Sequence, residues 1–159
     1  MKPSLSPLIL KDFAITENQF TFTSVNEGIN DLEELFNSYP IDIDFGYSEN
    51  DLYITISVKI QVNNADNPDI LGGYSIVAEG TSIFEFNNKV KLSNDERASL
   101  LNYSGLSITI NHVRGFIAAL TSYAPFGRYN LPTIDVNSLL SQKKDQLDCD
   151  WSSKNEIDK

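Results

Sequence analysis

The segment "LYITISVKIQV", residues 52–62, decides the fold class because its apolar and polar residues alternate without interruption. Successive side chains of a β-strand point to opposite faces, so this alternation predicts a strand with one buried face and one wet face. Strands of this kind are typical of antiparallel sheets. The apolar face carries Leu52, Ile54, Ile56, Val58, Ile60 and Val62.

Three further segments are predicted to be strands of the same sheet. Residues 41–47, "IDIDFGY", alternate in the same way, and the short polar linker "SENDL" predicts a hairpin with the segment that decides the fold. Residues 74–86 follow a loop that contains Asn-Pro and Gly-Gly, and Gly80 predicts a bulge within them. Residues 8–22 alternate irregularly, which predicts a bulge or bend near 17–19.

After the fourth strand the hydrophobic period changes to that of helices. Ser93 or Asn94 is expected to cap a short helix that carries Leu100 and Leu101. A longer helix is predicted from about Ser107, with an apolar stripe suited to covering the sheet. The stripe contains Ile110, Val113, Ile117, Leu120 and Ala124, and it is followed by the helix-ending residues Pro125 and Gly127.

A last helix is predicted to start at Asp135, its cap, and to carry Val136, Leu139, Leu140 and Leu147. Beyond Asp148 the chain is polar, and we expect it to fray. The crossing segment 23–40 is long and contains a helical turn at 32–36.

Strands followed by helices indicate an α+β fold: a four-stranded antiparallel sheet with a long helix and shorter helices on one face. We expect one domain over residues 1–147 and a polar, flexible tail over 148–159.

Composition excludes several classes of protein. The chain has 159 residues and a formal net charge of −10, which argues against nucleic acid as a partner. No apolar run has the length of a signal-peptide core or a membrane span, so neither export nor membrane insertion is expected. Cys149 is the only cysteine and excludes an internal disulfide. These features predict a cytoplasmic protein.

No arrangement of residues indicates catalysis, so we predict no catalytic residue, no metal and no cofactor. His112 is the only histidine, and a structural or surface role is the alternative to a catalytic one. The pairs Asp42/Asp44 and Glu33/Glu34 could serve acid–base chemistry, but each is also explained by a solvent-facing strand or helical turn. Neither a phosphate-binding glycine loop nor a calcium-loop motif is present.

Residues 111–140, "NHVRGFIAALTSYAPFGRYNLPTIDVNSLL", resemble the SecB family of cytoplasmic protein-export chaperones. That family carries L-F-P-Y-A-R-E-x-I and, further on, F-P-x-L-N-L-A-P-V-N-F-D-A-L. This chain keeps Arg114 and Ile117 in the first part, and Phe126, Asn130, Leu131 and Leu139 in the second.

Upstream, "NSYPIDIDF" is similar to the family's second-strand region, with Tyr39 where the family often has tryptophan. The resemblance extends over about residues 10–140. The chain departs from the family pattern at Asn111, which replaces a proline, at His112, which replaces a tyrosine, and at Pro132, which is displaced by one position.

The resemblance implies an ATP-independent holdase that assembles as a homotetramer, a dimer of dimers. Such a protein needs an accessible apolar groove for unfolded client polypeptides. We expect one wall of the groove to contain Phe36, Tyr39, Ile41 and Ile43, and the other to contain Tyr123, Phe126, Tyr129, Val136 and Leu140. Each of these residues could instead pack only in the core, and alternation already explains Ile41 and Ile43 in that way. Tyr39, Phe126 and Tyr129 are the strongest groove candidates because they lie in loops, where large aromatic residues are unexpected.

Two partners remain possible, the export motor SecA and an antitoxin. The tail does not resemble the SecB segment that contacts the export motor SecA, so an antitoxin is an alternative partner.

Two other classes of protein also remain open. A hot-dog-type thioester-acting enzyme would use an acid or a histidine near the start of its central helix, where His112 lies. A pure assembly protein would form oligomers but bind no client.

Overall fold

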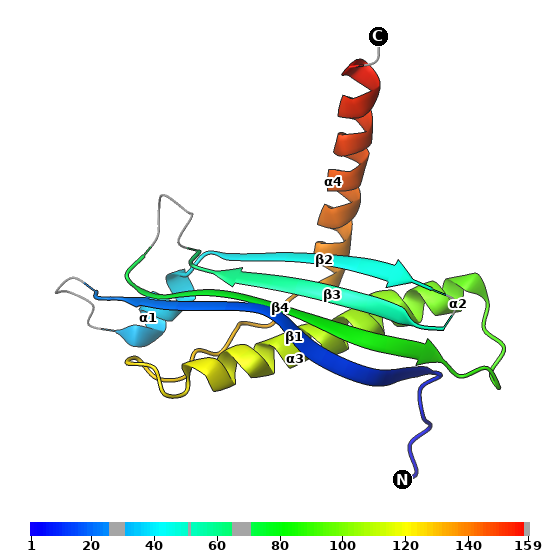
Figure 1. Cartoon of the computed structure of the whole chain (residues 1–159), viewed down its shortest axis with the longest axis horizontal. Helices are drawn as coiled ribbons and strands as arrows, with labels where there is room; N and C mark the ends of the chain where they lie inside the picture. Colours follow the sequence, from blue (N-terminus) through cyan, green and yellow to red (C-terminus); the bar gives the residue numbers. More distant parts are fainter. Residues whose placement is uncertain (26–30, 51, 65–70, 158–159) are drawn as a thin grey trace.

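In a computed structural model of the chain, residues 1–25, 31–50, 52–64 and 71–157 are described, with side chains as far as residue 146. Four strands precede most of the helical part, as the sequence predicts (Figure 1). The elements are β1 (Leu8–Thr23), α1 (Leu32–Ser38), β2 (Ile41–Glu49), β3 (Ile54–Val62), β4 (Gly73–Phe86), α2 (Asn94–Ser99), the π-helical segment η1 (Leu100–Gly105), α3 (Leu106–Thr121) and α4 (Val136–Ile157).

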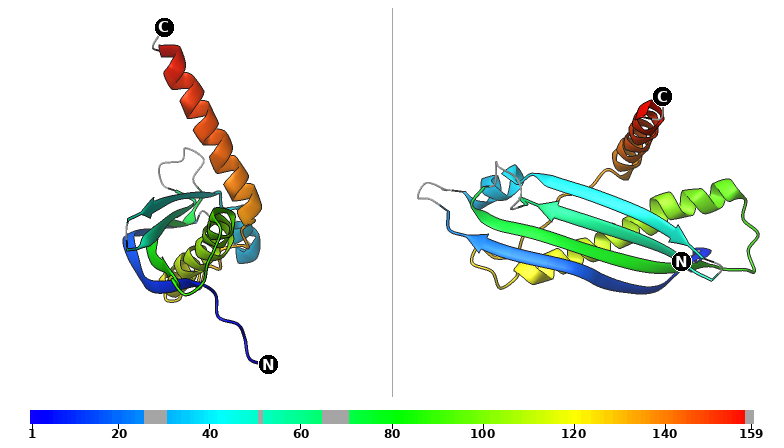
Figure 2. Two further views of the ribbon diagram at one scale, coloured as in Figure 1. Left: turned by 90° about the vertical axis from the view of Figure 1, so that its right-hand side faces the viewer. Right: turned by 45° about the horizontal axis from the view of Figure 1, so that its top comes forward.

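The strands form one antiparallel sheet in the order β1-β4-β3-β2. The strands β2, β3 and β4 follow one another along the chain and in the sheet, which confirms the predicted hairpin. Because β1 pairs with β4, the chain between β1 and β2 crosses from one edge of the sheet to the other (Figures 1 and 2). The predicted α+β class, with a four-stranded antiparallel sheet and a long helix on one face, is confirmed.

The central strand β3 has the predicted alternation. Its helix-facing side chains Ile56, Val58, Ile60 and Val62 are fully buried, whereas the intervening residues are half-buried. The strand starts at Ile54, two residues later than predicted. The side-chain oxygen of Asn50 accepts hydrogen bonds from the two backbone amides just before it, which turns that stretch away from the sheet.

The irregular pattern of β1 is caused by two extra residues. The register with β4 shifts between Leu10 and Asp12 and again between Ile15 and Glu17, close to the predicted bend. Each extra residue reverses the alternation. As a result Phe13, Phe20 and Phe22 all lie opposite helix-facing positions of β4, which a regular strand could not achieve.

The predicted bulge at Gly80 is wrong. Gly80 lies in an uninterrupted register with Val58 of β3, and the shift belongs to β1. A Cβ atom at Gly80 would lie 2.7 Å from the ring of Phe13 and 2.8 Å from Cγ2 of Val113. The glycine is therefore needed for the close approach of β1 and α3 to the sheet.

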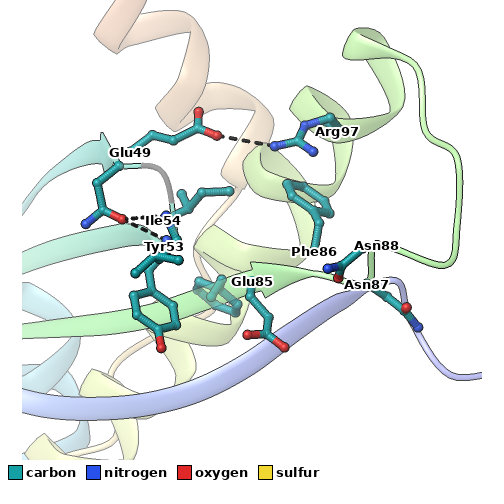
Figure 3. Close-up of a pocket in the computed structure, with 11 residues that line it drawn as sticks. Glu49, Tyr53, Ile54, Glu85, Phe86, Asn87, Asn88 and Arg97 are labelled. Atoms are coloured by element: carbon teal, nitrogen blue, oxygen red, sulfur yellow. Dashed lines mark hydrogen bonds and ion pairs between the residues drawn. The ribbon is translucent and has the colours of Figure 1, made fainter.

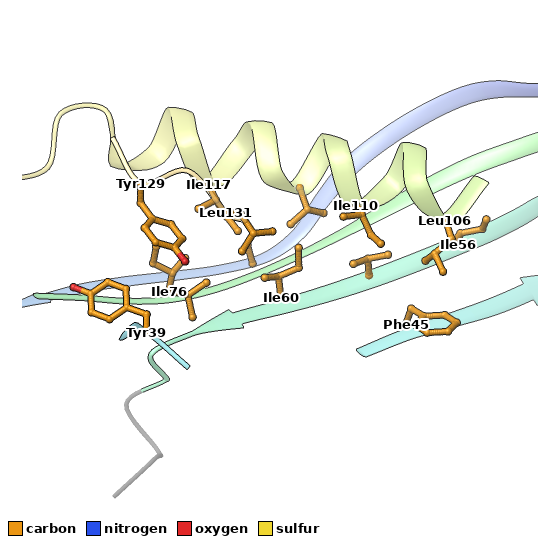
Figure 4. Close-up of a cluster of buried hydrophobic side chains, with 14 of the residues drawn as sticks. Tyr39, Phe45, Ile56, Ile60, Ile76, Leu106, Ile110, Ile117, Tyr129 and Leu131 are labelled. Carbon is orange, nitrogen blue, oxygen red and sulfur yellow. The ribbon is translucent and has the colours of Figure 1, made fainter. Parts of the chain in front are cut away.

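The long helix covers the apolar face of the sheet (Figure 4). Ile110, Val113 and Ile117 of α3 are buried against the sheet, as their spacing predicts. Ser93 forms a capping box with Glu96 at the start of α2. The two predicted helices are continuous through η1, so residues 94–121 form one helical segment. It ends at Thr121, and Ala124 lies beyond it.

The last helix, α4, begins as predicted, with the Asp135 side chain accepting hydrogen bonds from the amides of Asn137 and Ser138. It projects away from the sheet beyond β2 (Figures 1 and 2). The backbone remains helical to Ile157, past the position where fraying is predicted. The absence of proline and glycine after Pro132 is consistent with this continuation.

Candidate functional site: the aromatic cluster

Seven aromatic side chains gather where β4 begins and α1 ends, and we call them the aromatic cluster. Phe22 of β1 and Phe126 of the segment after α3 contact each other edge to face, with ring centroids 5.1 Å apart. Phe36 lies 5.5 Å from Tyr74 and 5.3 Å from Tyr129, centroid to centroid. The members are Phe20, Phe22, Phe36, Tyr39, Tyr74, Phe126 and Tyr129.

The tyrosines of the cluster lie inside, and its phenylalanines lie at the surface. Tyr39 is 4% exposed, Tyr129 is 1% exposed and Tyr74 is fully buried. The expectation that Tyr39 and Tyr129 are accessible from their loops is therefore wrong for the protomer. All four phenylalanines of the cluster are half-buried, including the predicted groove residues Phe36 and Phe126. The accessible apolar surface of the site is thus carried by phenylalanine.

The hydroxyl groups of two of these buried tyrosines are satisfied by hydrogen bonds to the backbone. The Tyr39 hydroxyl donates to the carbonyl of Gly72 at 3.2 Å and accepts from the amide of Tyr74 at 2.9 Å. The Tyr74 hydroxyl donates to the carbonyl of Gly127 and accepts from the amide of Phe126, both at 2.8 Å. A buried tyrosine normally finds such partners.

The ionisation of the cluster gives no support for acid–base chemistry. Burial is the main cause that raises the pKa of Tyr39 and of Tyr74, and it raises the pKa of Tyr129 to about 12. All three hydroxyls are neutral near pH 7, so they act as hydrogen-bonding groups rather than as bases. Tyr129 Oη is buried and has no hydrogen-bond partner among the described residues.

The remaining predicted groove residues are spread beside the cluster. Ile41 and Ile43 are half-buried on the helix-facing side of β2, opposite Val62 and Ile60. Val136 and Leu140, at the start of α4, are also half-buried and pack against the core. Tyr123 is fully exposed in the turn after α3 and is set apart from the cluster's inner rings.

Three cluster members were missed by the sequence reasoning: Phe20, Phe22 and Tyr74. The alternation of Phe20 and Phe22 shows that both share one face of a strand. Only the pairing of β1 with β4 shows that this face is that of Tyr74, because Phe22 lies directly opposite it. That pairing joins residues about fifty positions apart and has no local signature.

His112 is half-buried and stacks on Phe13, with ring centroids 4.6 Å apart. Its Nδ1 is buried and has no partner within the described ranges, so no carboxylate orients that nitrogen there. Among the described residues, no group of three or more potential ligands could hold a metal ion.

A pocket of about 370 Å³ lies at the other end of the sheet, between the β2–β3 turn and α2 (Figure 3). Its wall includes an ion pair of Arg97 with Glu49 at 3.2 Å, and the Arg97 guanidinium lies 4.2 Å from the centre of the Phe86 ring. Arg97 and Glu49 thus neutralise each other's charge in the wall of this pocket.

Comparison with solved structures shows a SecB-like fold. The SecB-like chaperone Rv1957 of Mycobacterium tuberculosis, in complex with a ChAD peptide from the Rv1956 HigA1 antitoxin, matches with a TM-score of 0.59 and 10% sequence identity. The match covers 80% of this chain and 91% of that chain. A protein of unknown function from Streptococcus agalactiae matches with a TM-score of 0.40 and 14% identity, over 79% of this chain and 97% of that one.

Sequence comparisons give no relative. No protein-family model matches the chain, and no curated protein matches it. Within the described part of the chain, no helix combines the length and the apolar character needed to cross a membrane.

Proposed function

We propose that this protein is an ATP-independent holdase that binds unfolded polypeptides at the aromatic cluster. The observation that carries the proposal is that three half-buried phenylalanines from separate segments, Phe22, Phe36 and Phe126, all pack on the ring of Tyr74 at one end of the sheet. Apolar surface that stays partly accessible on a folded protein is typical of interaction sites. The SecB-like fold supports a chaperone role for this surface.

The charge of the protein fits this role. A holdase must display apolar surface without associating with itself in an uncontrolled way, and a net charge of −10 favours solubility. Client segments would bind through apolar side chains at the cluster and through main-chain hydrogen bonds along the outer strands β1 and β2. We propose that residues 1–147 contain the whole binding domain and that it acts in the cytoplasm as a homotetramer.

An antitoxin is the client that the comparison favours over SecA. The SecB-like structure of similar fold was solved with an antitoxin peptide, which supports a peptide as the ligand of this protein. No comparable observation supports SecA for this chain. Binding of a peptide from an antitoxin encoded beside this protein's gene would test the assignment.

The holdase activity is tested by aggregation of heat-denatured citrate synthase, followed by light scattering without nucleotide. Wild-type protein at an equimolar ratio of protomers should delay aggregation. The double variant Phe36→Ser/Phe126→Ser should need at least about fivefold more protein for the same delay of aggregation. The reason is that contact of a client with two accessible rings contributes roughly 1–2 kcal/mol to binding.

The matched control is Leu52→Ser. Leu52 is 74% exposed at the opposite end of the sheet, so its removal also deletes exposed apolar surface but leaves the cluster intact. This variant should protect citrate synthase as well as wild type does. Absence of protection by the wild-type protein would refute the proposed function, and equal losses in both variants would refute the assignment to the cluster.

A further inference from the structure

We propose that Tyr74 is the positioning residue of the client site and couples its two walls so that they move as one unit. This inference rests on the proposed function. One wall is α1 with Tyr39, and the other is the segment 122–131 that follows α3. Both are held by the backbone and side chain of this single residue at the start of β4.

The first wall is attached through the amide of Tyr74. This amide donates to the hydroxyl of Tyr39 at 2.9 Å. Tyr39 is also the C-cap of α1, where its own amide donates to the carbonyl of Phe36 at 3.4 Å. The position of Tyr39 therefore determines the end of α1 and the place of the half-buried Phe36 ring.

The second wall is attached through the hydroxyl of Tyr74. One oxygen accepts from the amide of Phe126 and donates to the carbonyl of Gly127, which are more than fifty residues away along the chain. Tyr74 is fully buried, so water cannot replace these bonds without opening the cluster. Tyr129 is held separately, because its amide donates to the Thr121 hydroxyl at 2.9 Å.

The ring of Tyr74 fills the space between the walls. Its centroid lies 5.5 Å from that of Phe36 on one side and 5.9 Å from that of Phe126 on the other. A displacement of either phenylalanine thus presses on Tyr74, which is hydrogen-bonded to the Tyr39 hydroxyl of one wall and to backbone groups of Phe126 and Gly127 in the other. The site is therefore expected to open or close as a whole rather than one wall at a time.

Tyr74→Phe tests the coupling, because it removes the hydroxyl and keeps the ring. The probe is reduced, carboxamidomethylated, fluorescein-labelled lysozyme, which stays unfolded, and binding is measured by fluorescence anisotropy. Tyr74→Phe should raise the Kd about five- to tenfold, the loss expected for one to two hydrogen bonds. Tyr39→Phe should act in the same direction. The double variant should lose less than the product of the two single effects, because either change alone already uncouples the walls.

Thr109→Val is the matched control for general destabilisation. The Thr109 hydroxyl is also fully buried and makes two hydrogen bonds, to the Ser82 hydroxyl at 2.9 Å and to the Gly105 carbonyl at 3.0 Å, but it lies outside the cluster. All variants are compared at a temperature at which circular dichroism shows them folded. Thr109→Val should leave the Kd within about twofold of the wild-type value. A Kd for Tyr74→Phe that equals the wild-type or Thr109→Val value would overturn the inference while leaving the holdase proposal intact.

Amide hydrogen exchange of the free protein tests the same coupling without a client. In Tyr74→Phe, peptides covering 31–40 and 122–131 should both exchange faster than in wild type, whereas Thr109→Val should change neither. Faster exchange confined to 122–131 would show that the walls are independent and would overturn the inference. If wild-type protein binds no unfolded lysozyme, the proposed function fails, and this exchange result still decides whether Tyr74 couples the two segments.

Discussion

Gly73 shows how strongly a single residue can constrain the candidate site. Its φ of +100° lies in the region that favours glycine, and a Cβ atom there would come within 2.1 Å of the Tyr39 hydroxyl oxygen and 3.4 Å of the Phe126 ring. The Gly-Gly sequence predicts a loop at this point. It does not show that both walls of the site approach the backbone so closely.

We predict that Gly73→Ala lowers the free energy of unfolding by about 3 kcal/mol, because backbone strain and steric overlap with Tyr39 add together. Urea denaturation followed by circular dichroism measures this change. Gly46→Ala is the control, since no atom lies within 4 Å of a Cβ atom built there, and its effect should stay below about 0.5 kcal/mol. Similar stabilities of the two variants would contradict the packing described at Gly73.

Tyr39 and Tyr129 show what limits prediction at the scale of single residues. The sequence correctly marks them as unusual, because large aromatic side chains are rare in loops. It cannot show that the hydroxyl of Tyr39 bonds Gly72 and the Tyr74 amide, more than thirty positions away. Burial of a loop residue depends on such long-range partners, which local composition does not reveal.

At the scale of the elements, regular alternation predicts the buried face of a strand, whereas the irregular pattern of β1 predicts a bend but not the face that the strand buries. The strict alternation in β3 gave its buried face and its hairpin, although a side chain of the turn, Asn50, moved its start to Ile54. In β1 the register shifts preserve an apolar face that the sequence shows only as a broken pattern. The bulge predicted at Gly80 is wrong because a glycine within a strand can also be required where neighbouring side chains approach the backbone closely.

The helix α4 is attached to the sheet through a contact that the sequence does not indicate. Lys143 Nζ lies 2.5 Å from Oδ1 of Asp44 on β2 and 5.8 Å from the centre of the Phe45 ring. The hydrogen bond from Lys143 is the main cause that lowers the pKa of Asp44. Since the Asp44 side chain is 66% exposed, the pair positions α4 rather than contributing much global stability.

We predict that Lys143→Met raises the pKa of Asp44 towards the ordinary value of an aspartate, and that NMR titration of the carboxyl carbon detects the change. The folded-state pKa is depressed, so the attachment is complete above about pH 4, the usual pKa of an aspartate. It is lost as the pH falls through the lower folded value. Lys144→Met should leave this titration unchanged. An Asp44 titration that does not respond to Lys143→Met would rule out the contact in solution.

For the whole molecule, the order of strands and helices was enough to predict the architecture. Four strands followed by a long helix with a 3–4 spaced apolar stripe gave the α+β class and the covered face of the sheet. The strand order β1-β4-β3-β2 was not predictable, because alternation identifies a buried face but not the neighbour of each strand.

We predict that the protein forms a homotetramer, with a mass four times the protomer's 17.8 kDa in multi-angle light scattering at micromolar concentration. The physical reason is that β1 and β2 are the outer strands of the sheet, and no strand of the described residues pairs with their outer edges. Raising the salt concentration should not dissociate an assembly held by such main-chain bonds. A monomeric mass under these conditions would contradict the prediction.

The two extra residues of β1, Lys11 and Thr16, also bear on how such an edge avoids uncontrolled growth. A flat strand of sixteen residues would be a continuous template for cross-β fibrils, in which identical segments stack in register. The register shifts divide β1 into three shorter ladders, and a second chain is not expected to follow all of them with a regular strand. We therefore expect the irregularity that obscures β1 in the sequence also to hinder the stacking of this strand into amyloid.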